Sequence, residues 1–342
     1  MSTFETIIHD TNQSDDHPSD LLLDVRELKI TFSTRQGEIN AVNGVSFDVR
    51  RGEIVAIVGE SGCGKSATAL SLLRLIPDPP GRVTGGQILF EGNDLCKMST
   101  REIRAIRGNR IAMIFQEPMT SLNPVHTIGR QVGEPLRIHR GASTNEALCK
   151  AATLLGGVNI SEPEVRMRNY PHQFSGGMRQ RVTIAMGMGC KPDLIVADEP
   201  TTALDVTIQA QVLELLRQQV DDNHSGMLII THNLGVVAQY ADRVNVMYAG
   251  RIVESAMAHE LYSDPRHPYT VGLLQSVPRL DQPATERLAE ITGQPPDPSN
   301  LPSGCAFHPR CPRAINRCGV EMPSLEAVSP THKRACWVDY HE

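Results

Sequence analysis

The sequence predicts an α/β fold, in which short buried strands alternate with helices. Apolar runs of strand length recur through the first 255 residues, and segments rich in helix-forming residues separate them. The run at residues 53–58 leads directly into a Gly-rich turn, and residues 65–75 then have the pattern of a helix without Gly or Pro. A strand, a Gly-rich turn and a helix in this order are the setting in which proteins bind phosphate groups.

The same patterns place the other elements. We expect strands over residues 21–32, 41–49, 53–58, 85–90, 111–115, 194–197 and 227–230. We expect helices over residues 65–75, 101–107, 178–189 and 208–220, with a mostly helical stretch from about 123 to 170. Frequent prolines after residue 255 predict an irregular segment. The expected organisation is a tail (1–20), an α/β domain (21–255) with a helical subdomain at about 120–180, and a C-terminal domain (256–342).

Composition limits the classes of protein that this chain can belong to. Of its 342 residues 40% are hydrophobic, so it can bury a sizeable core, and its net charge of −6 provides no overall basic field for nucleic acid. No run approaches the roughly 18 apolar residues of a membrane span, and residues 1–20 lack the pattern of a secretory signal. We therefore expect a cytoplasmic protein with a disordered, polar N-terminal tail.

The Gly-rich turn fits the spacing of a phosphate-binding loop, with Gly, four residues, and Gly-Lys-Ser. Glycines allow backbone amides to surround phosphate oxygens, and the following helix presents its N-terminus to the same charge. In this pattern Lys65 reaches the β- and γ-phosphates and the Ser66 hydroxyl ligates Mg²⁺. The strand and helix around it argue against a chance Gly-rich turn. The loop comprises Gly59, Glu60, Ser61, Gly62, Cys63, Gly64, Lys65 and Ser66.

Two further motifs suit phosphate chemistry. The apolar run at 194–197 ends in Asp198, which can hold Mg²⁺, and Glu199, which can act as a general base toward water. Ser175, Gly176 and Gly177 precede a predicted helix and can form a second anion-binding turn. Each motif has a plainer interpretation, an acidic turn after a core strand in the first case and a helix N-cap in the second.

Together and in this order, the motifs resemble those of the ABC transporter ATPases over about residues 21–255. On this resemblance residues 59–66 match Walker A, and residues 194–198 match Walker B, with Asp198 on Mg²⁺ and Glu199 as the catalytic glutamate. Gln116 matches the Q-loop glutamine, which ligates Mg²⁺ and senses the γ-phosphate. His232 matches the switch histidine, which contacts that phosphate.

The resemblance also implies a site shared between two chains. Residues 174–178 match the signature motif, as Phe-Ser-Gly-Gly-Met instead of Leu-Ser-Gly-Gly-Gln, and Asp205 belongs to the D-loop. Phe32 matches the adenine-stacking aromatic by position. Cys63 replaces a usual Ser or Gly, and an exposed thiol there would make activity sensitive to alkylation. In the family two domains meet head to tail, and the signature of one completes the ATP site of the other.

The sequence resembles one group of this family, the dipeptide and oligopeptide importer ATPases, over nearly the whole chain after residue 20. The similar residues are 119–124, 127–129, 267–270, 273–274, 276–278 and the Cys-rich C-terminus. The resemblance implies a peripheral subunit on the cytoplasmic face of the bacterial inner membrane. Its partners would be two membrane permease subunits, a periplasmic substrate-binding protein and a second, related ATPase subunit in a heterodimer. Nickel importers share this architecture, so the cargo stays open.

Cys305, Cys311, Cys318 and Cys336 crowd the last 38 residues. Thiols gathered in an irregular segment suit a metal centre, because a reducing cytoplasm disfavours disulfides. The spacing is wider than usual for zinc and permits an iron–sulfur cluster. The resemblance to the dipeptide-permease ATPases favours a 4Fe–4S cluster over zinc, which could use His308 or His332 as substitute ligands; unliganded thiols are a third possibility. Three arginines lie near these cysteines in the sequence: Arg310, Arg313 and Arg317. As cationic neighbours they would lower the pKa of the thiols, and the plainer interpretation is a solvated basic face.

Two other functions compete with the importer motor. A non-transport ABC ATPase of the DNA-repair type can also carry a Cys-rich module, but such proteins have two ATPase halves or long insertions, whereas this core is single, compact and acidic. A binding module without turnover is opposed by the presence of Glu199 and His232. The expected function is therefore ATP hydrolysis coupled to import, with ATP and Mg²⁺ as cofactors and no nucleic-acid partner.

Overall fold

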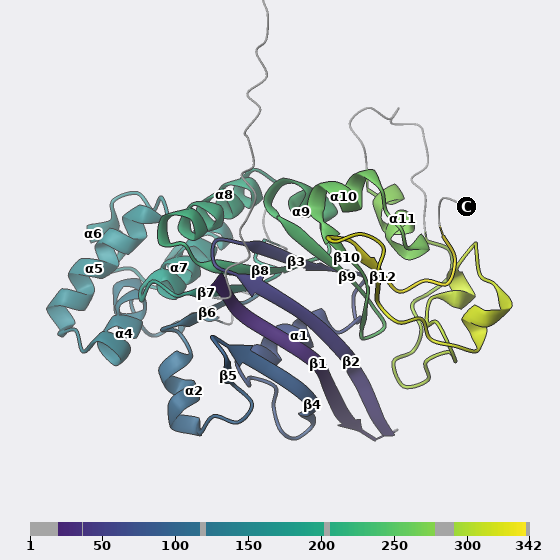
Figure 1. The fold of residues 1–342 in the computed structure, drawn as a ribbon. Helices are drawn as coiled ribbons and strands as arrows, with labels where there is room; N and C mark the ends of the chain where they lie inside the picture. The colour runs from purple at the N-terminus through teal and green to yellow at the C-terminus, as the bar shows by residue number, and fades with distance from the viewer. Residues whose placement is uncertain (1–19, 36, 117–120, 202–205, 278–290, 340–342) are drawn as a thin grey trace, which may run out of the picture.

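The computed structural model describes residues 20–35, 37–116, 121–201, 206–277 and 291–339, and it confirms the α/β class. A four-stranded antiparallel sheet has the order β2-β1-β4-β5 (Figure 1). An eight-stranded sheet has the order β11-β12-β10-β9-β3-β8-β7-β6, and the neighbours from β9 to β6 are parallel. The strands are β1 (Leu21–Thr34), β2 (Gly37–Arg50), β3 (Ile54–Val58), β4 (Gly81–Phe90), β5 (Asn93–Asp94), β6 (Ile111–Ile114), β7 (Leu194–Asp198), β8 (Gly226–Thr231), β9 (Arg243–Tyr248), β10 (Arg251–Met257), β11 (Glu326–Ala327) and β12 (Lys333–Arg334).

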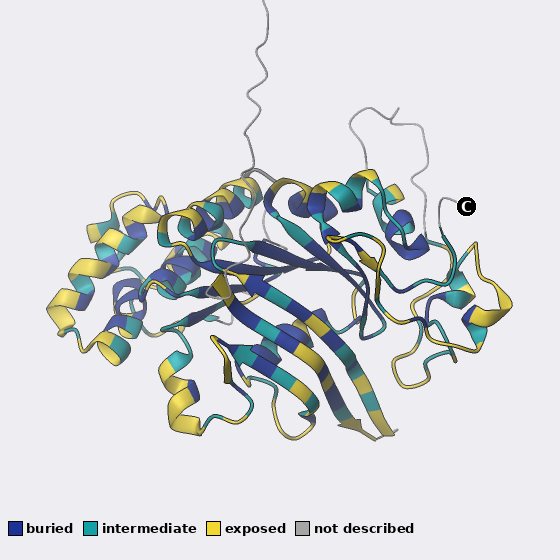
Figure 2. Ribbon diagram, viewed as in Figure 1, coloured by how far each residue is buried: buried dark blue, intermediate teal, exposed yellow. Residues whose placement is uncertain are grey.

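The central strands are almost entirely apolar, as expected for strands whose two faces are both covered. Every residue of β3, β7 and β8 is buried, as the dark blue strands of Figure 2 show. On β3, Val55 and Ile57 pack into a core shared with the antiparallel sheet. Ile54 and Val58 point to the other core, which is shared with the helices. The continuous apolar runs of the sequence therefore correspond to strands buried between two layers.

The helices begin and end where the sequence supplies caps. Both α2 and α5 begin at a capping box. In each, the side chain of the N-cap Ser accepts a hydrogen bond from the amide of a Glu three residues later, and the side chain of that Glu accepts one from the Ser amide. Helix α1 ends at Leu72, earlier than the predicted residue 75, and Arg74 adopts a positive φ of 51°. The helices are α1 (Lys65–Leu72), α2 (Thr100–Ile106), α4 (Ile128–Arg140), α5 (Thr144–Gly157), α6 (Pro163–Arg166), α7 (Gly176–Met188), α8 (Val206–Asn223), α9 (Leu234–Tyr240), α10 (Ala258–Ser263) and α11 (Pro268–Gln275), with 3₁₀ turns η2 (Pro171–Gln173), η3 (His308–Arg310) and η4 (Asn316–Gly319).

Helices α4 to α7 gather at one end of the molecule, where the sequence predicts a helical subdomain (Figure 1). The expected disordered tail at 1–20 lies outside the described residues except for Asp20. In the part of the chain that the structure describes, no helix has the length and apolar character needed to cross a bilayer.

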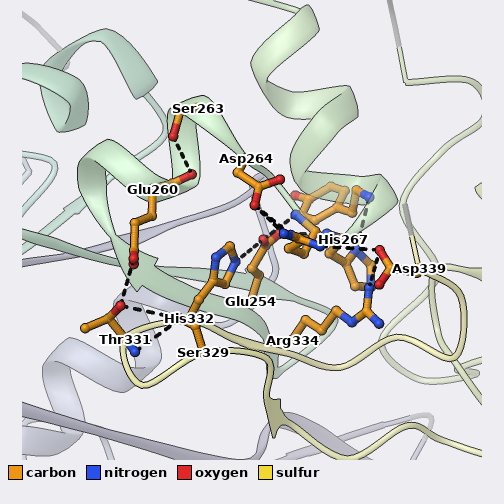
Figure 3. A network of polar contacts seen from close by, with 12 residues as sticks. Glu254, Glu260, Ser263, Asp264, His267, Ser329, Thr331, His332, Arg334 and Asp339 are labelled. Carbon is orange, nitrogen blue, oxygen red and sulfur yellow. Dashed lines mark hydrogen bonds and ion pairs between the residues drawn. The ribbon is translucent and has the colours of Figure 1, made fainter. Parts of the chain in front are cut away.

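The C-terminal segment returns to the main sheet. The boundary predicted near residue 255 falls inside β10, and Glu254 of β10 pairs with Arg334 of β12. The Glu254 side chain is fully buried and accepts hydrogen bonds from His332 Nε2 (2.7 Å) and from the backbone amides of Arg266 (2.6 Å) and His267 (3.0 Å) (Figure 3). A buried carboxylate with three partners ties the C-terminal segment at His332 to the α/β core.

Candidate nucleotide-binding site

The predicted phosphate loop connects β3 to α1, as the sequence pattern requires. Gly59 and Gly64 have φ values of 155° and 106°, which L side chains rarely adopt. A Cβ on Gly59 would lie 2.1 Å from the Met247 carbonyl oxygen, and one on Gly64 would lie 2.4 Å from the Ala41 carbonyl oxygen. These two positions therefore require glycine, both for their conformation and for the close approach of neighbouring backbone.

Lys65 is buried at the start of α1, and its amine lies inside the loop. Its Nζ donates to the carbonyl oxygens of Gly59 (2.8 Å) and Glu60 (2.9 Å). No side chain caps the first turn of α1, since its N-cap is Gly64. A buried cation beside uncapped helix amides is a setting that favours phosphate.

Cys63 is buried, which corrects the hypothesis of an exposed, alkylation-sensitive thiol at this position. Burial raises the pKa of the thiol, although the positive charge of Lys65 opposes the shift. The side chain thus packs as an apolar group, and its protonated form is favoured.

A hydroxyl and a carboxylate meet at the end of β7. Ser66 Oγ donates to Asp198 Oδ1 at 3.1 Å. Burial raises the pKa of Asp198, and the negative charge of Glu199 adds to this, while the Ser66 hydrogen bond and Lys65 lower it. A divalent cation would compensate the buried negative charge, and hydroxyl and carboxylate oxygens are the ligands that Mg²⁺ prefers. The residues predicted to hold Mg²⁺ therefore fit that ion.

Glu199 is the point at which three strand ends converge. Gln116 follows β6, Glu199 follows β7 and His232 follows β8, and these strands are neighbours in the sheet. Gln116 Nε2 donates to Glu199 Oε2 at 2.8 Å, and His232 Nδ1 lies 3.1 Å from Glu199 Oε1. The Glu199 backbone has a positive φ of 48°, a conformation that is costly for a residue with a side chain and that clusters at active sites. The structure thus brings together three residues that the sequence singled out separately.

Ser175, Gly176 and Gly177 lie on a different element, at the start of α7. Ser175 Oγ accepts a hydrogen bond from the Met178 amide at 3.3 Å, so the N-cap interpretation of this Ser describes its contact. A Cβ on Gly177 would lie 2.9 Å from Ile208 Cγ2, which explains that glycine by packing. A contact of these residues with the nucleotide of a partner chain stays a prediction.

Phe32 lies on β1, where its ring packs against Gly81, and it pairs across the strands with Ile39. Ile39 in turn lines a cavity of about 390 Å³ together with Ser61 and Gly62 of the loop. Phe32 is therefore on the strand next to β2, the strand whose Ile39 lines this cavity with the loop. Adenine stacking by the Phe32 ring stays a prediction. Asp205, the predicted D-loop residue, lies outside the described residues.

The four C-terminal cysteines line one small cavity of about 10 Å³, the size of a single water molecule: Cys305, Cys311, Cys318 and Cys336. Their thiols are free, and burial raises the pKa of Cys305 to about 11, against the lowered thiolate pKa values expected from nearby arginines. Among the described residues, no group of three or more His, Cys, Asp or Glu is arranged to hold a metal ion. The structure therefore gathers the thiols but does not support the predicted metal-binding segment.

His332 is not a substitute ligand in this arrangement, which corrects that part of the zinc alternative. Its Nε2 is bound to the buried Glu254. The other candidate, His308, lines the same cavity as the cysteines, and its Nδ1 lies 2.9 Å from the Cys305 carbonyl oxygen.

Sequence reasoning missed two contacts that the C-terminal part of the chain makes with the loop, one of them from Arg310, which it had named only as a cation near the cysteines. Tyr269 Oη accepts a hydrogen bond from the Glu60 amide at 2.9 Å, and Arg310 forms an ion pair with the Glu60 side chain. The only signal was that both residues lie in segments singled out by resemblance, residues 267–270 and the Cys-rich cluster. Neither segment gave a reason to place its residues at the nucleotide site.

A phosphate loop on a parallel sheet, with two acidic residues at the end of strand β7 of the same sheet, defines a P-loop nucleotide-binding protein. Comparison with known proteins narrows this class. The ABC transporter model matches residues 42–202, and the model for the oligopeptide/dipeptide transporter C-terminal region matches residues 253–318. The chain belongs to the ABC transporter family and carries the C-terminal region of its oligopeptide/dipeptide group.

Three curated relatives span almost the whole chain. The "Probable peptide ABC transporter ATP-binding protein y4tR" of Sinorhizobium fredii is 52% identical, covering 93% of this chain and 95% of its own. The dipeptide transport ATP-binding protein DppD of Bacillus subtilis is 50% identical over 93% and 94%. The oligopeptide transport ATP-binding protein OppD of Salmonella typhimurium is 47% identical over 95% and 96%.

The fold also matches solved structures. The dimeric structure of MJ0796, a bacterial ABC transporter cassette, aligns with a TM-score of 0.63 and 27% identity, over 69% of this chain and 99% of that chain. Its post-hydrolysis state bound to ADP and Pi aligns with a TM-score of 0.62 over the same shares. The solved cassette is aligned over almost its whole length, whereas part of this chain is left unaligned. This chain has the additional C-terminal region matched at residues 253–318.

Proposed function

We propose that this chain is the ATP-hydrolysing motor subunit of a bacterial importer for dipeptides or oligopeptides. The observation that carries the hydrolytic part is the Gln116–Glu199–His232 convergence beside the Ser66–Asp198 pair. The peptide cargo is supported by the names of the relatives and by the matched C-terminal region. The site residues keep the roles expected from the sequence, with Lys65 on the phosphates, Glu199 as base toward water and His232 on the γ-phosphate.

The proposed assembly follows from the same family. Two membrane permease subunits and a periplasmic binding protein supply the cargo path, and the chain attaches at the cytoplasmic face of the inner membrane. The signature residues Ser175, Gly176 and Gly177 face the nucleotide of a second, related ATPase subunit. The dimeric form of the matched cassette supports a two-domain arrangement. Nucleotide between the two domains acts as the contact that closes the dimer, and hydrolysis opens it.

Reconstitution of the chain with permeases tests this function. The chain, its related ATPase subunit and the two permeases are co-purified and placed in proteoliposomes. Binding protein loaded with a dipeptide or oligopeptide is expected to raise ATP hydrolysis above the rate with empty binding protein. Stimulation by Ni²⁺-loaded binding protein alone would move the cargo to nickel. Failure to bind permeases, together with hydrolysis stimulated by linear DNA, would contradict the transport function.

We further propose a 4Fe–4S cluster at Cys305, Cys311, Cys318 and Cys336, with zinc as the alternative. The support is the donor set, since four thiols from an irregular segment line one cavity. The cavity holds about one water, so the thiols must move outward to accept a four-iron cluster.

Anaerobic purification decides this point. We expect a brown protein that absorbs at about 400 nm and contains iron and sulfide. The Cys318→Ser variant is expected to lose the absorbance, while Cys149→Ser, at an exposed thiol on α5, is expected to keep it. A colourless preparation with stoichiometric zinc would replace the cluster by zinc. A preparation without iron or zinc would contradict both.

A further inference from the structure

Glu60, the second residue of the phosphate loop, is held by the C-terminal part of the chain. Arg310 contacts its carboxylate through both terminal nitrogens, Nη1 to Oε2 at 2.7 Å and Nη2 to Oε1 at 3.0 Å. The Arg310 side chain is only 5% exposed. A bidentate guanidinium–carboxylate pair fixes direction as well as charge, so Arg310 determines where the Glu60 side chain lies.

The Glu60 peptide is fixed in the same way. Its amide donates to Tyr269 Oη at 2.9 Å, and its carbonyl oxygen accepts from Lys65 Nζ at 2.9 Å. Tyr269 is fully buried and packs 4.5 Å from the Tyr248 ring, so its hydroxyl is a rigid acceptor. The backbone of the loop is therefore held from its outer side by a C-terminal residue and from its inner side by the lysine of the loop.

Arg310 itself has little freedom. Its Nε donates to the Thr292 carbonyl oxygen (3.1 Å), its Nη2 to the Ile291 carbonyl oxygen (3.3 Å) and its Nη1 to Tyr248 Oη (3.3 Å). The guanidinium also lies 6.0 Å from the centre of the Phe307 ring. It is the last residue of η3, directly before Cys311, so the backbone of the Cys-rich segment positions the guanidinium.

The charge of this pair matters because of where it lies. Glu60 places a carboxylate in a loop that has to accept the negative phosphates of ATP, and two like charges repel strongly where water is excluded. The Arg310 guanidinium neutralises that carboxylate and holds it in place by a two-point contact. Without the guanidinium, the loop would present an uncompensated negative charge to its ligand.

We propose that Arg310 is a positioning residue for the phosphate-binding loop, through which the Cys-rich segment sets the affinity for ATP. The inference rests on the proposed nucleotide site at residues 59–66. Arg310 acts on the nucleotide only through Glu60 and the loop backbone. Its effect therefore falls on nucleotide binding and not on the hydrolytic step, since Glu199, Gln116 and His232 lie at other strand ends.

The Arg310→Ala variant is expected to bind ATP about tenfold more weakly, an effect in the range of coupling between distinct sites. Its KM for ATP rises accordingly, while its kcat changes little. Adding Glu60→Gln to this variant removes the uncompensated charge and is expected to restore most of the lost affinity. Arg310→Lys keeps the charge but loses the two-point contact, and its affinity is expected to lie between those of the parent and Arg310→Ala.

The measurement is the Kd of a fluorescent ATP analogue for the full chain, with thermal unfolding of each variant as a check on folding. Arg317→Ala is the matched control, because Arg317 lies in the same segment and pairs with exposed Glu321 instead of the loop. The Lys65→Met variant separates the proposed nucleotide site from the proposed role of Arg310. If Lys65→Met and Arg310→Ala both bind ATP as tightly as the parent, the assignment of the nucleotide site is wrong. If Lys65→Met loses binding and Arg310→Ala does not, only the positioning role is overturned. A double variant as weak as Arg310→Ala would also overturn it, since packing alone would then explain the loss.

Discussion

Replacement of Glu199 by Gln is expected to slow ATP hydrolysis about a thousandfold, within the range typical for loss of a general base. Gln has the same shape and can keep hydrogen bonds to Gln116 and His232, so the geometry of the strand ends is preserved. It lacks the negative charge that accepts a proton from water. ATP binding is expected to persist, because the phosphate loop is untouched. Steady-state phosphate release and the Kd of a fluorescent ATP analogue measure the two effects separately.

Glu214→Gln is the matched control for this prediction. Glu214 is an exposed carboxylate on α8 that accepts a hydrogen bond from Gln218, and its replacement is expected to leave hydrolysis unchanged. Hydrolysis by the Glu199→Gln variant at the parent rate would contradict the assignment of the base. A parallel loss of hydrolysis and binding would instead indicate a structural role for Glu199.

Replacement of Lys65 by Met is expected to weaken ATP binding at least about a hundredfold, which corresponds to about 3 kcal/mol. The buried amine is a cation inside the phosphate loop, and Met fills a similar volume without charge. The Gly59 and Glu60 carbonyl oxygens lose their donor in this variant, so thermal unfolding has to accompany the Kd measurement.

Lys97→Met is the comparison for this variant. Lys97 is 75% exposed and pairs with Asp94, and we expect no change in ATP affinity when it is replaced. Equal ATP affinities for the parent and for a folded Lys65→Met variant would show that phosphates bind elsewhere on the chain.

The sequence predicts the parts of this molecule that depend on local patterns. The apolar run, the glycines and the Lys-Ser pair of the loop lie within 14 residues, so the P-loop could be recognised without long-range information. The apolar runs before Gln116, Glu199 and His232 placed each residue at a strand end. Parallel pairing of β6, β7 and β8 then brings those ends together, which follows from the topology of such sheets.

The contacts of the C-terminal segment could not be predicted in this way. Strands β9 and β10 were not expected from the sequence, and the Glu60–Arg310 pair joins residues 250 positions apart. No periodicity or spacing encodes such a pair, because it depends on how the irregular segment folds back on the sheet. The predicted boundary near residue 255 reflected a change in composition, whereas hydrogen bonds from β10 to β12 continue the sheet across it.

Two other features depend on information outside a single chain's local pattern. Ser175 caps α7 in this structure, and the local pattern by itself predicts only that cap. The contact with a nucleotide on another chain is implied only by the resemblance to the ABC ATPases. The cysteine spacing indicated a gathered set of thiols, and they do line one cavity. Spacing alone cannot set the distances between thiols, and the arrangement of the described residues does not match a metal site.

The most direct test of the proposed hydrolytic role of Glu199 is the identity of the nucleotide that the Glu199→Gln variant retains after incubation with radiolabelled ATP and Mg²⁺ in the assembled transporter. Rapid removal of free nucleotide is followed by separation of ATP from ADP. The Glu199→Gln variant is expected to retain more intact ATP than the parent, which yields ADP. Lys65→Met is expected to retain less nucleotide than either, because only the site of the related subunit then binds it. Recovery of ADP from Glu199→Gln at the rate of the parent would contradict the role of Glu199. Recovery of bound nucleotide from Lys65→Met at the level of the parent would contradict the role of Lys65.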